Sequence, residues 1–221
     1  MRIKVILCQA NLGHSGLQGV ITTLALGDSI TFGIGASDGN SYRSYLKDKL
    51  AQDGIEIDYI GNVRAGRMQD NDCVCVSGAR IDEISNYADA SLPQQPQVVL
   101  LKAGTNDVGQ NRDLANAPNR LMGLVDKIFA ASPNSTVLVA SLVPLPFFAD
   151  GQAKIDSFNE RIQPLLEQKI SLGLHVVFIS MAAITNADLA DGIHPNDRGY
   201  QKMADAWYAG WISAKQKGWI P

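Results

Sequence analysis

The sequence predicts an α/β fold in which a parallel sheet of about five strands is covered by helices on both faces. Apolar, β-branched runs such as residues 20–26 and 97–103 are typical of parallel strands buried on both sides. Segments with helical periodicity alternate with these runs, which indicates a three-layer α/β/α sandwich. Because such connections are right-handed, few topologies remain, and we expect the flavodoxin-like strand order 2-1-3-4-5.

The expected strands comprise residues 20–26, 56–60, 97–103, 136–141 and 174–180. The expected helices comprise residues 42–52, 81–87, 112–131, 152–172 and a last one from the capping residue Asn196 to about Lys217. The last helix should bury a stripe formed by Tyr200, Met203, Ala204, Trp207 and Trp211. Between the second strand and the second helix, residues 61–79 form a long polar loop, and long loops in compact domains are often functional.

Length and composition fit one domain. The chain has 221 residues, of which 46% are hydrophobic, and this is enough for one sizeable core. No linker, charge run or repeat divides it, so we expect residues 20–221 to form a single domain. The net charge of −3 argues against a nucleic-acid partner. No apolar run reaches the length of a transmembrane segment.

The first 19 residues are interpreted as an N-terminal extension of unassigned origin. Met1–Cys8 begins like a signal peptide, but Gln9 and Asn11 interrupt the apolar run, and no small-residue cleavage site follows. The sequence therefore does not assign a cellular compartment.

Three cysteines are present: Cys8, Cys73 and Cys75. Cys73 and Cys75 lie two residues apart in the expected loop. An odd number leaves at least one thiol without an internal partner, and no second pair offers a zinc site. The cysteines are interpreted either as packing residues or as one disulfide with one free thiol.

Ser29 is the candidate nucleophile. It follows the first strand in Gly27-Asp28-Ser29, on the turn at the carboxyl end of the strand, where open α/β sheets form their sites. There its backbone N–H is free to bind an anion. The alternative is that Asp28 and Ser29 are ordinary turn or cap residues.

Topology selects His194 as the candidate base from the three histidines. His14 precedes the first strand and His175 precedes the fifth, so both should lie at the amino edge of the sheet, whereas His194 follows the fifth strand. Asp191 can turn back to hold the imidazole N–H, which sets the tautomer and stabilises the imidazolium. The same segment could instead be an Asx-turn before the last helix.

A nucleophilic serine also needs donors for the developing oxyanion. The candidates are the Ser29 N–H, the side-chain amide of Asn106 after the third strand, and a backbone N–H at Gly78, where glycine permits close approach of the main chain. Asp107 cannot donate when it is ionised, so we expect it to accept hydrogen bonds from nearby N–H groups. Asn106 and Gly78 could alternatively be simple turn residues.

Four short blocks of this sequence, taken in order, resemble the conserved blocks of the SGNH (GDSL) hydrolase family. The blocks are Gly27-Asp28-Ser29, Gly78, Gly104-Thr105-Asn106-Asp107 and Asp191-Gly-Ile-His194-Pro195, and the match spans residues 24 to about 211. The resemblance implies that Ser29 is the nucleophile, that His194 is the base oriented by Asp191, and that Gly78 and Asn106 share the oxyanion hole with Ser29. It implies no metal and no organic cofactor.

Within that family the sequence is most similar to acetylxylan esterases of the third carbohydrate-esterase family. The similarity rests on Gly27–Thr31, Tyr42-Arg43, Ser77–Asp82 and the Asp191 block running to Tyr200. Those esterases usually carry Glu-Gly-His-Ser-Gly and an aromatic residue in the second block, where this chain reads Val74–Ala79. The oxyanion glycine is kept, but the neighbouring histidine and aromatic residue are not, so the sugar specificity is left open. The resemblance also favours secretion.

We therefore expect a serine esterase of small acyl esters, with O-acetyl groups on carbohydrate as the favoured substrate. An alternative is a lysophospholipase or thioesterase in which Phe147 and Phe148 line a longer acyl pocket, although both could simply pack beneath a loop. A third hypothesis is a non-catalytic carbohydrate-binding module on the same fold. That hypothesis predicts a missing nucleophile or base, and both are present here. The oligomeric state is not indicated.

Overall fold

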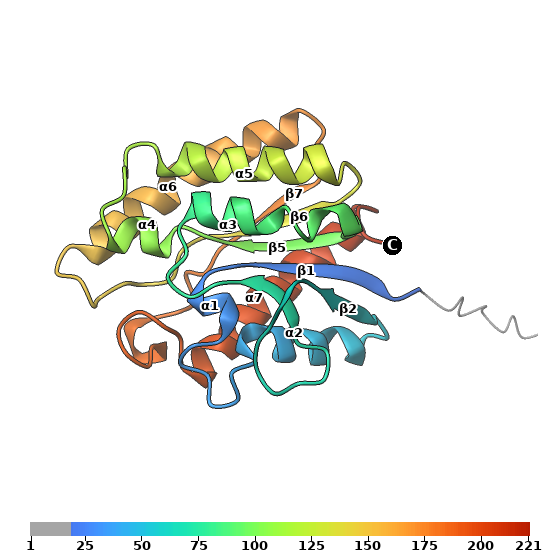
Figure 1. Cartoon of the computed structure of the whole chain (residues 1–221), viewed down its shortest axis with the longest axis horizontal. Coiled ribbons are helices and arrows are strands. Elements are labelled where there is room, and N and C mark those ends of the chain that lie inside the picture. The colour runs from blue at the N-terminus through green and yellow to red at the C-terminus, as the bar shows by residue number, and fades with distance from the viewer. Residues whose placement is uncertain (1–18) are drawn as a thin grey trace, which may run out of the picture.

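In the part of the chain that the structure describes, seven strands form one sheet between two layers of helices (Figure 1). The computed structural model describes residues 19–221. Residues 1–18, with Cys8 and His14, lie outside that range, and the expected extension over residues 1–19 stays a prediction.

The sheet has the predicted parallel order, with one antiparallel addition. Its strands are β1 (Ile21–Gly27), β2 (Ile57–Ile60), β3 (Val63–Arg64), β4 (Asp72–Cys75), β5 (Val98–Lys102), β6 (Thr136–Ala140) and β7 (Val176–Ile179). Strand β1 lies between β2 and β5, followed by β6 and β7, which confirms the expected order. Strands β3 and β4 pair antiparallel inside residues 61–79, so the prediction that this segment is entirely loop is wrong.

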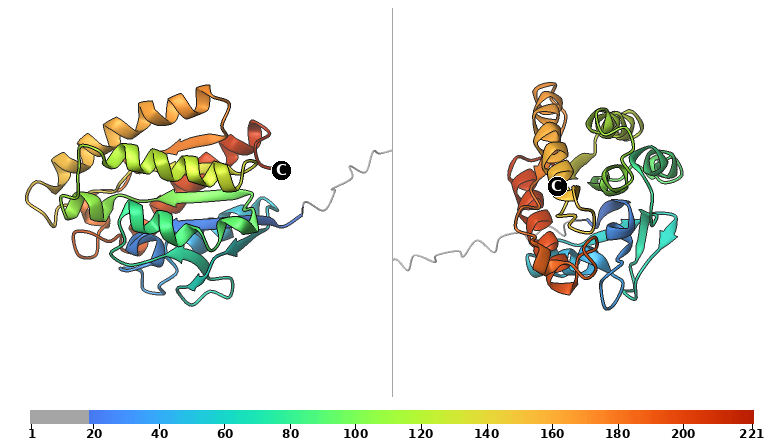
Figure 2. Two further views of the ribbon diagram at one scale, coloured as in Figure 1. Left: turned by 45° about the horizontal axis from the view of Figure 1, so that its top comes forward. Right: turned by 90° about the vertical axis from the view of Figure 1, so that its left-hand side faces the viewer.

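Helices cover both faces of the sheet (Figures 1 and 2). They are α1 (Ser29–Phe32), α2 (Ser41–Gln52), α3 (Ile81–Ala88), α4 (Thr105–Gly109), α5 (Ala117–Ala131), α6 (Gly151–Ser171) and α7 (Asp197–Gln216), with 3₁₀ turns η1 (Leu92–Gln94) and η2 (Asn186–Asp188). Helices α3, α5 and α6 pack on one face, and α2 and α7 on the other. All five residues of the predicted α7 stripe are buried, and Asn196 accepts the Gly199 N–H at 3.0 Å as the cap.

Helix α5 begins later than the predicted residue 112. Asn111 and Asp113 have φ angles of 54° and 41°, which interrupt a right-handed helix. Pro118 lies in the first turn of α5, where its missing N–H costs no intrahelical hydrogen bond.

Along one edge, strand β1 pairs with β2 over its first half and with β4 over its end. Residues 21–24 pair with β2, whereas Leu26 and Gly27 pair with β4. The exchange occurs at Gly61, where a Cβ atom would lie 2.1 Å from the carbonyl oxygen of Cys73. This close backbone approach lets β4 replace β2, and it delivers residues 76–79 to the carboxyl end of β1.

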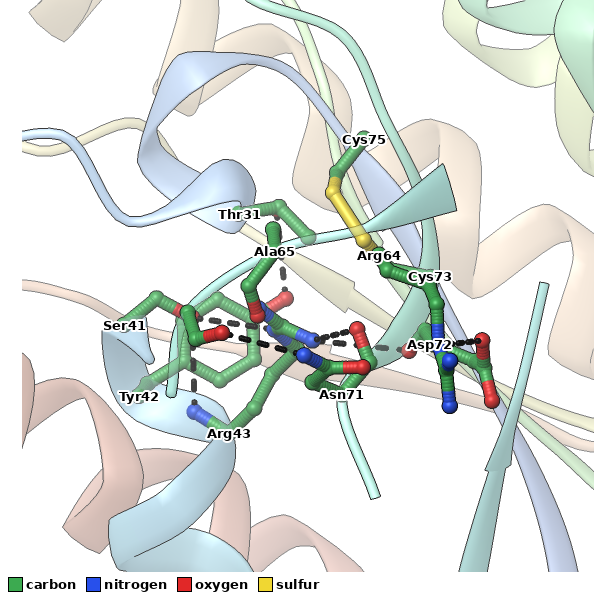
Figure 3. Close-up of a disulfide and its surroundings, with 11 residues drawn as sticks. Thr31, Ser41, Tyr42, Arg43, Arg64, Ala65, Asn71, Asp72, Cys73 and Cys75 are labelled. Atoms are coloured by element: carbon green, nitrogen blue, oxygen red, sulfur yellow. Dashed lines mark hydrogen bonds and ion pairs between the residues drawn. A yellow bond between two sulfur atoms is a disulfide. The ribbon is translucent and has the colours of Figure 1, made fainter. Parts of the chain in front are cut away.

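Strand β4 contains a disulfide between Cys73 and Cys75 (Figure 3). Both residues are buried in the layer formed with α2 and α7. Of the two interpretations of the cysteines, the structure therefore shows a disulfide, and their expected position in a loop is wrong. Cys8 is outside the described residues.

The segment between β3 and β4 is anchored by the buried side chain of Arg43 in α2 (Figure 3). Its guanidinium donates to the carbonyl oxygens of Ala65 at 2.8 Å and Asn71 at 3.0 Å, with a longer contact to Asp72 at 3.4 Å. Burial lowers the pKa of Arg43, and these carbonyl oxygens compensate the buried charge. Helix α2 thereby holds the loop that leads into β4.

We predict that Gly61→Ala lowers the melting temperature, because the new methyl group overlaps backbone atoms of Cys73 that cannot rotate away. Such overpacking costs about 1–3 kcal/mol. The matched control is Gly123→Ala at an exposed position of α5 with nothing within 4 Å of the added carbon. Alanine should leave the stability of that helix unchanged or raise it. Thermal unfolding followed by circular dichroism measures both, and equal melting temperatures would contradict the close approach at Gly61.

Candidate active site

The predicted site residues meet at the carboxyl edge of the sheet. Ser29 opens α1 directly after β1, and Asn106 lies in α4 directly after β5. Gly78 follows β4, and His194 lies between η2 and α7. Parallel strands end at the same edge, which is why four segments distant in sequence converge.

Ser29, His194 and Asp191 form a continuous hydrogen-bonded series. The Ser29 Oγ lies 3.0 Å from His194 Nε2, and His194 Nδ1 lies 2.7 Å from Asp191 Oδ2. The Ser29 residue is only 4% exposed. This order of hydroxyl, imidazole and carboxylate is the arrangement that activates a serine nucleophile.

Asp191 is positioned by its own turn. Its Oδ1 accepts the backbone N–H groups of His194 at 2.8 Å and Ile193 at 3.0 Å. Partial burial raises the pKa of Asp191, but these bonds and the bond from the imidazole outweigh it and hold the pKa below its ordinary value. The carboxylate is therefore ionised where it faces the ring, and Gly192, with φ of 82°, permits the tight turn.

The segment that carries His194 packs against the loop that follows α1. A Cβ atom on Gly35 would lie 2.4 Å from the carbonyl oxygen of Pro195. The Ser37 N–H donates to Asp197 Oδ1 at 2.8 Å, and the Tyr200 hydroxyl donates to the carbonyl oxygen of Ile34 at 2.6 Å. These contacts hold the imidazole segment against the segment that carries the serine.

Three hydrogen-bond donors surround the same edge. Within residues 19–221, the Ser29 and Gly78 N–H groups have no hydrogen-bond acceptor. The Asn106 amide donates one hydrogen to the carbonyl oxygen of Ala79 at 2.9 Å, which leaves its second hydrogen for a ligand. The Val76 N–H donates to the carbonyl oxygen of Gly27 at 3.2 Å. The loop bearing Gly78 is thereby fastened to both β1 and α4.

Asp107 is a structural acceptor, as expected. Its Oδ2 accepts the Ile81 N–H at 3.0 Å, and its Oδ1 accepts from Arg120 at 2.6 Å. Burial raises the pKa of Asp107, and the bonds from Arg120 and Ile81 oppose that rise. Asp107 thus joins α4 to the first turn of α3.

A buried ion pair that was not predicted from the sequence lies beneath this edge. Lys102 and Asp28 are both fully buried, and their side chains lie 3.1 Å apart between Nζ and Oδ2. Lys102 also donates to the Thr105 hydroxyl. Burial lowers the pKa of Lys102, and Asp28 opposes that shift. The sequence signal for this ion pair was Lys102 itself, a charged residue at the end of an otherwise apolar strand.

His175, Phe147 and Phe148 take no part in the hydrogen-bonded series of Ser29, His194 and Asp191. His175 precedes β7 at the amino edge, where its ring stacks on Trp219 with centroids 4.8 Å apart. Phe147 is 62% exposed, and its N–H donates to the carbonyl oxygen of Gly192 at 3.1 Å. Phe148 is half-buried and packs on Gly109. A role for either phenylalanine in an acyl pocket stays a prediction.

Residues 19–221 contain no cluster of three or more histidine, cysteine or acidic side chains placed to bind a metal ion. Across the same range no helix combines the length and the hydropathy needed to cross a membrane.

Comparison with known proteins identifies the family of this chain. The GDSL-like Lipase/Acylhydrolase family matches residues 25–202. The chain belongs to this family. A solved family 3 carbohydrate esterase from Clostridium thermocellum is 32% identical, with a TM-score of 0.79 over 90% of this chain and 98% of that one. A family 3 carbohydrate esterase from Talaromyces cellulolyticus, at 24% identity, shares the fold with a TM-score of 0.77 over 89% of this chain and 99% of its own.

Among curated proteins, a multidomain esterase of Ruminococcus flavefaciens is 28% identical over 87% of this chain. The chain spans 28% and 49% of the lengths of the two curated proteins that it matches. The expected family and α/β fold of this chain are confirmed, and its relatives support the expected reaction class, hydrolysis of a carboxylic ester.

The loop carrying His194 is closed at its base by Asp188, which is buried. The Asp188 carboxylate accepts from Lys202 at 2.6 Å and from the N–H and hydroxyl of Thr185, both at 2.8 Å. Its backbone carbonyl accepts the Asn196 N–H at 2.9 Å. Chiefly because of the hydrogen bond from Lys202, the pKa of Asp188 is lowered from 3.8 to about 2.

We predict a specific loss of stability in acid from this carboxylate. Because its pKa is lower in the folded protein, its contribution to stability is present above about pH 4 and is lost as the pH falls toward 2. Asp188→Asn should therefore lower the melting temperature at pH 6 but reduce its decline between pH 4 and 2. Calorimetry across this range measures the effect, with Asp205→Asn at an exposed ion pair as the control. Parallel curves for wild type and Asp188→Asn would contradict it.

Proposed function

We propose that this chain is a serine esterase in which Ser29 is the nucleophile and His194 the general base. The observation that carries the proposal is the series of hydrogen bonds from Ser29 Oγ through His194 to Asp191. An isolated serine hydroxyl is a weak nucleophile, and an imidazole at 3.0 Å can accept its proton during attack.

The reaction then proceeds in two halves. Ser29 Oγ attacks the ester carbonyl while His194 Nε2 takes the hydroxyl proton, and the imidazolium returns that proton to the departing alcohol. Water next attacks the acyl-serine, His194 accepts its proton, and the acid is released as Ser29 is reprotonated. Asp191 stabilises the imidazolium in both halves, because its carboxylate faces Nδ1 at 2.7 Å.

The oxyanion of each tetrahedral intermediate is bound by the N–H groups of Ser29 and Gly78 and by the free amide hydrogen of Asn106. All three donors are held before substrate arrives. The Val76–Gly27 and Asn106–Ala79 hydrogen bonds hold the Gly78 loop and the Asn106 amide, and the Asp28 cap fixes the start of α1 at Ser29. Donors that need not reorganise stabilise developing charge most effectively.

For the substrate, we propose a small acyl ester, with an O-acetyl group on carbohydrate favoured. Support comes from the similarity to the family 3 carbohydrate esterase of C. thermocellum across nearly the whole of both chains. Phe147 is exposed, and its backbone N–H is hydrogen-bonded to the Gly192 carbonyl oxygen in the turn before His194. The Phe147 ring offers an apolar surface to a sugar ring or, in the alternative of a lysophospholipase or thioesterase, to a longer acyl chain.

Ser29→Ala and His194→Ala should each abolish hydrolysis of p-nitrophenyl acetate, with kcat lower by about 10⁶ as in other triad hydrolases. His175→Ala is the matched control, because this histidine lies at the opposite edge of the sheet and should keep its kcat. Circular dichroism checks that each variant is folded. Substantial activity in Ser29→Ala, or a loss in His175→Ala equal to that in His194→Ala, would refute the assignment.

Substrate length separates the candidate activities. In a series of p-nitrophenyl esters from acetate to palmitate, kcat/KM should be highest for acetate, and the protein should release acetate from acetylated xylan. A maximum at octanoate or longer would favour the lysophospholipase or thioesterase. A wild-type chain that cleaves no ester, and whose Ser29 is not labelled by a phosphonate ester, would be a non-catalytic module.

A further inference from the structure

We propose that Lys102 is a positioning residue of the oxyanion hole, whose buried ammonium holds the turn before Ser29 and the turn before Asn106 in a fixed relation. The inference rests on the proposed function, because it concerns the donors used in ester hydrolysis. Lys102 acts through its neighbours and does not contact substrate.

The contacts of the ammonium are with the residues that immediately precede the two donors. Lys102 Nζ lies 3.1 Å from Asp28 Oδ2 and 3.4 Å from Asp28 Oδ1, and Asp28 precedes Ser29. The same nitrogen donates to the hydroxyl of Thr105, which precedes Asn106. One buried group therefore connects the backbone donor on α1 with the side-chain donor on α4.

The Lys102 ammonium has as many hydrogen-bond acceptors around it as it has hydrogens to donate. An ammonium carries three N–H bonds, and two carboxylate oxygens and one hydroxyl oxygen receive them. Asp28 Oδ1 also accepts the Ile30 N–H at 3.0 Å, so the carboxylate that holds the ammonium also caps the helix bearing Ser29. A movement of the lysine is thus transmitted to the start of α1.

The backbone brings the lysine to this place. Lys102 is the last residue of β5 and is the register partner of Gly27, the last residue of β1. A Cβ on Gly27 would lie 2.5 Å from the Lys102 carbonyl oxygen. The ends of β1 and β5 are therefore fixed relative to each other. From this point the Lys102 side chain reaches both the turn before Ser29 and the turn before Asn106.

Stability alone does not account for such a pair. Replacing a buried ion pair by apolar residues is often neutral or stabilising, whereas removing one partner leaves a costly unpaired charge. Oxyanion donors, in contrast, must lie about 2.7–3.1 Å from the developing charge, so their positions have a tolerance of only a few tenths of an ångström. A displacement of about 1 Å in a catalytic group can cost on the order of 10² in rate.

The first test is Lys102→Met, which keeps an unbranched side chain of similar volume and removes the ammonium and its charge. We expect kcat for p-nitrophenyl acetate to fall by about 10²–10³, the loss typical of one oxyanion donor, with KM changed less than about threefold. The rate is expressed per Ser29 titrated by a phosphonate ester, well below the melting temperature. Affinity for an alkylboronic acid, which mimics the tetrahedral intermediate, should fall with kcat, while affinity for acetate stays near wild type.

Two comparison variants give the scale of the effect. Asn106→Ala removes a donor directly and should match Lys102→Met in its kcat loss. Lys47→Met removes an ammonium bound by Asp70 and by the Ile57 carbonyl oxygen at the amino edge of the sheet. This control should lower the melting temperature without changing kcat per titrated serine.

Thr105→Val provides a milder test that keeps the ion pair and the side-chain shape. Its kcat should fall by about three- to tenfold, less than the full strength of one hydrogen bond to a charged group, because Asp28 still holds the ammonium. If Thr105 acts through Lys102, the double variant with Lys102→Met should be no worse than Lys102→Met alone. Thr105→Val also decides the question if Lys102→Met does not fold, since unchanged kcat and boronate affinity in this variant would overturn the proposal.

A purely structural lysine gives a different result. Lys102→Met would then have a lower melting temperature, while kcat per titrated serine and boronate affinity stay within about threefold of wild type, and the proposal would be wrong. If the wild-type chain neither hydrolyses esters nor reacts with the phosphonate, the proposed function itself fails, and the role of Lys102 fails with it. Ester hydrolysis and phosphonate labelling of the wild-type chain therefore show whether the proposed function has failed or only the proposed role of Lys102.

Discussion

The structure depends on three strand ends that meet at Gly27. On one side Gly27 is the register partner of Cys75 in β4, and on the other it is the partner of Lys102 in β5. A side chain at this position would overlap Thr31 at 2.3 Å and the Lys102 carbonyl oxygen at 2.5 Å. Only glycine lets β1 turn into α1 while both neighbours stay paired, and that turn is where Ser29 is presented.

From that point hydrogen bonds extend outward to each segment of the site. The Gly27 carbonyl oxygen receives the Val76 N–H, and Asn106 holds Ala79, so the Gly78 loop is attached on both sides. On the opposite side, the His194 segment is held by its own turn and by the loop after α1. The geometry proposed for catalysis is thus formed in the folded chain before any ester binds, which is the condition for effective electrostatic stabilisation.

Three buried charged side chains attach loops and helices to the strands and helices around the site. Arg43 holds the β3–β4 segment, Asp107 joins α4 to α3, and Asp188 closes the His194 loop. Each group has several hydrogen-bond partners, which is what a buried charge requires if it is not to destabilise the fold. The strand β4 that leads into the Gly78 loop is itself buried and contains the Cys73–Cys75 disulfide.

The sequence by itself determined the layers, the strand order and the edge at which the site forms. Apolar strands alternate with periodic helices, and parallel strands end on one side, so Ser29, Gly78, Asn106 and His194 could be assigned to a single edge. Only the tertiary structure decided that the polar segment contains β3 and β4. Strands this short form only by pairing: β4 pairs with the end of β1 that β2 leaves free, and β3 pairs with β4. It also decided that Lys102 is buried, since its partner Asp28 lies 74 residues away and no local pattern relates the two.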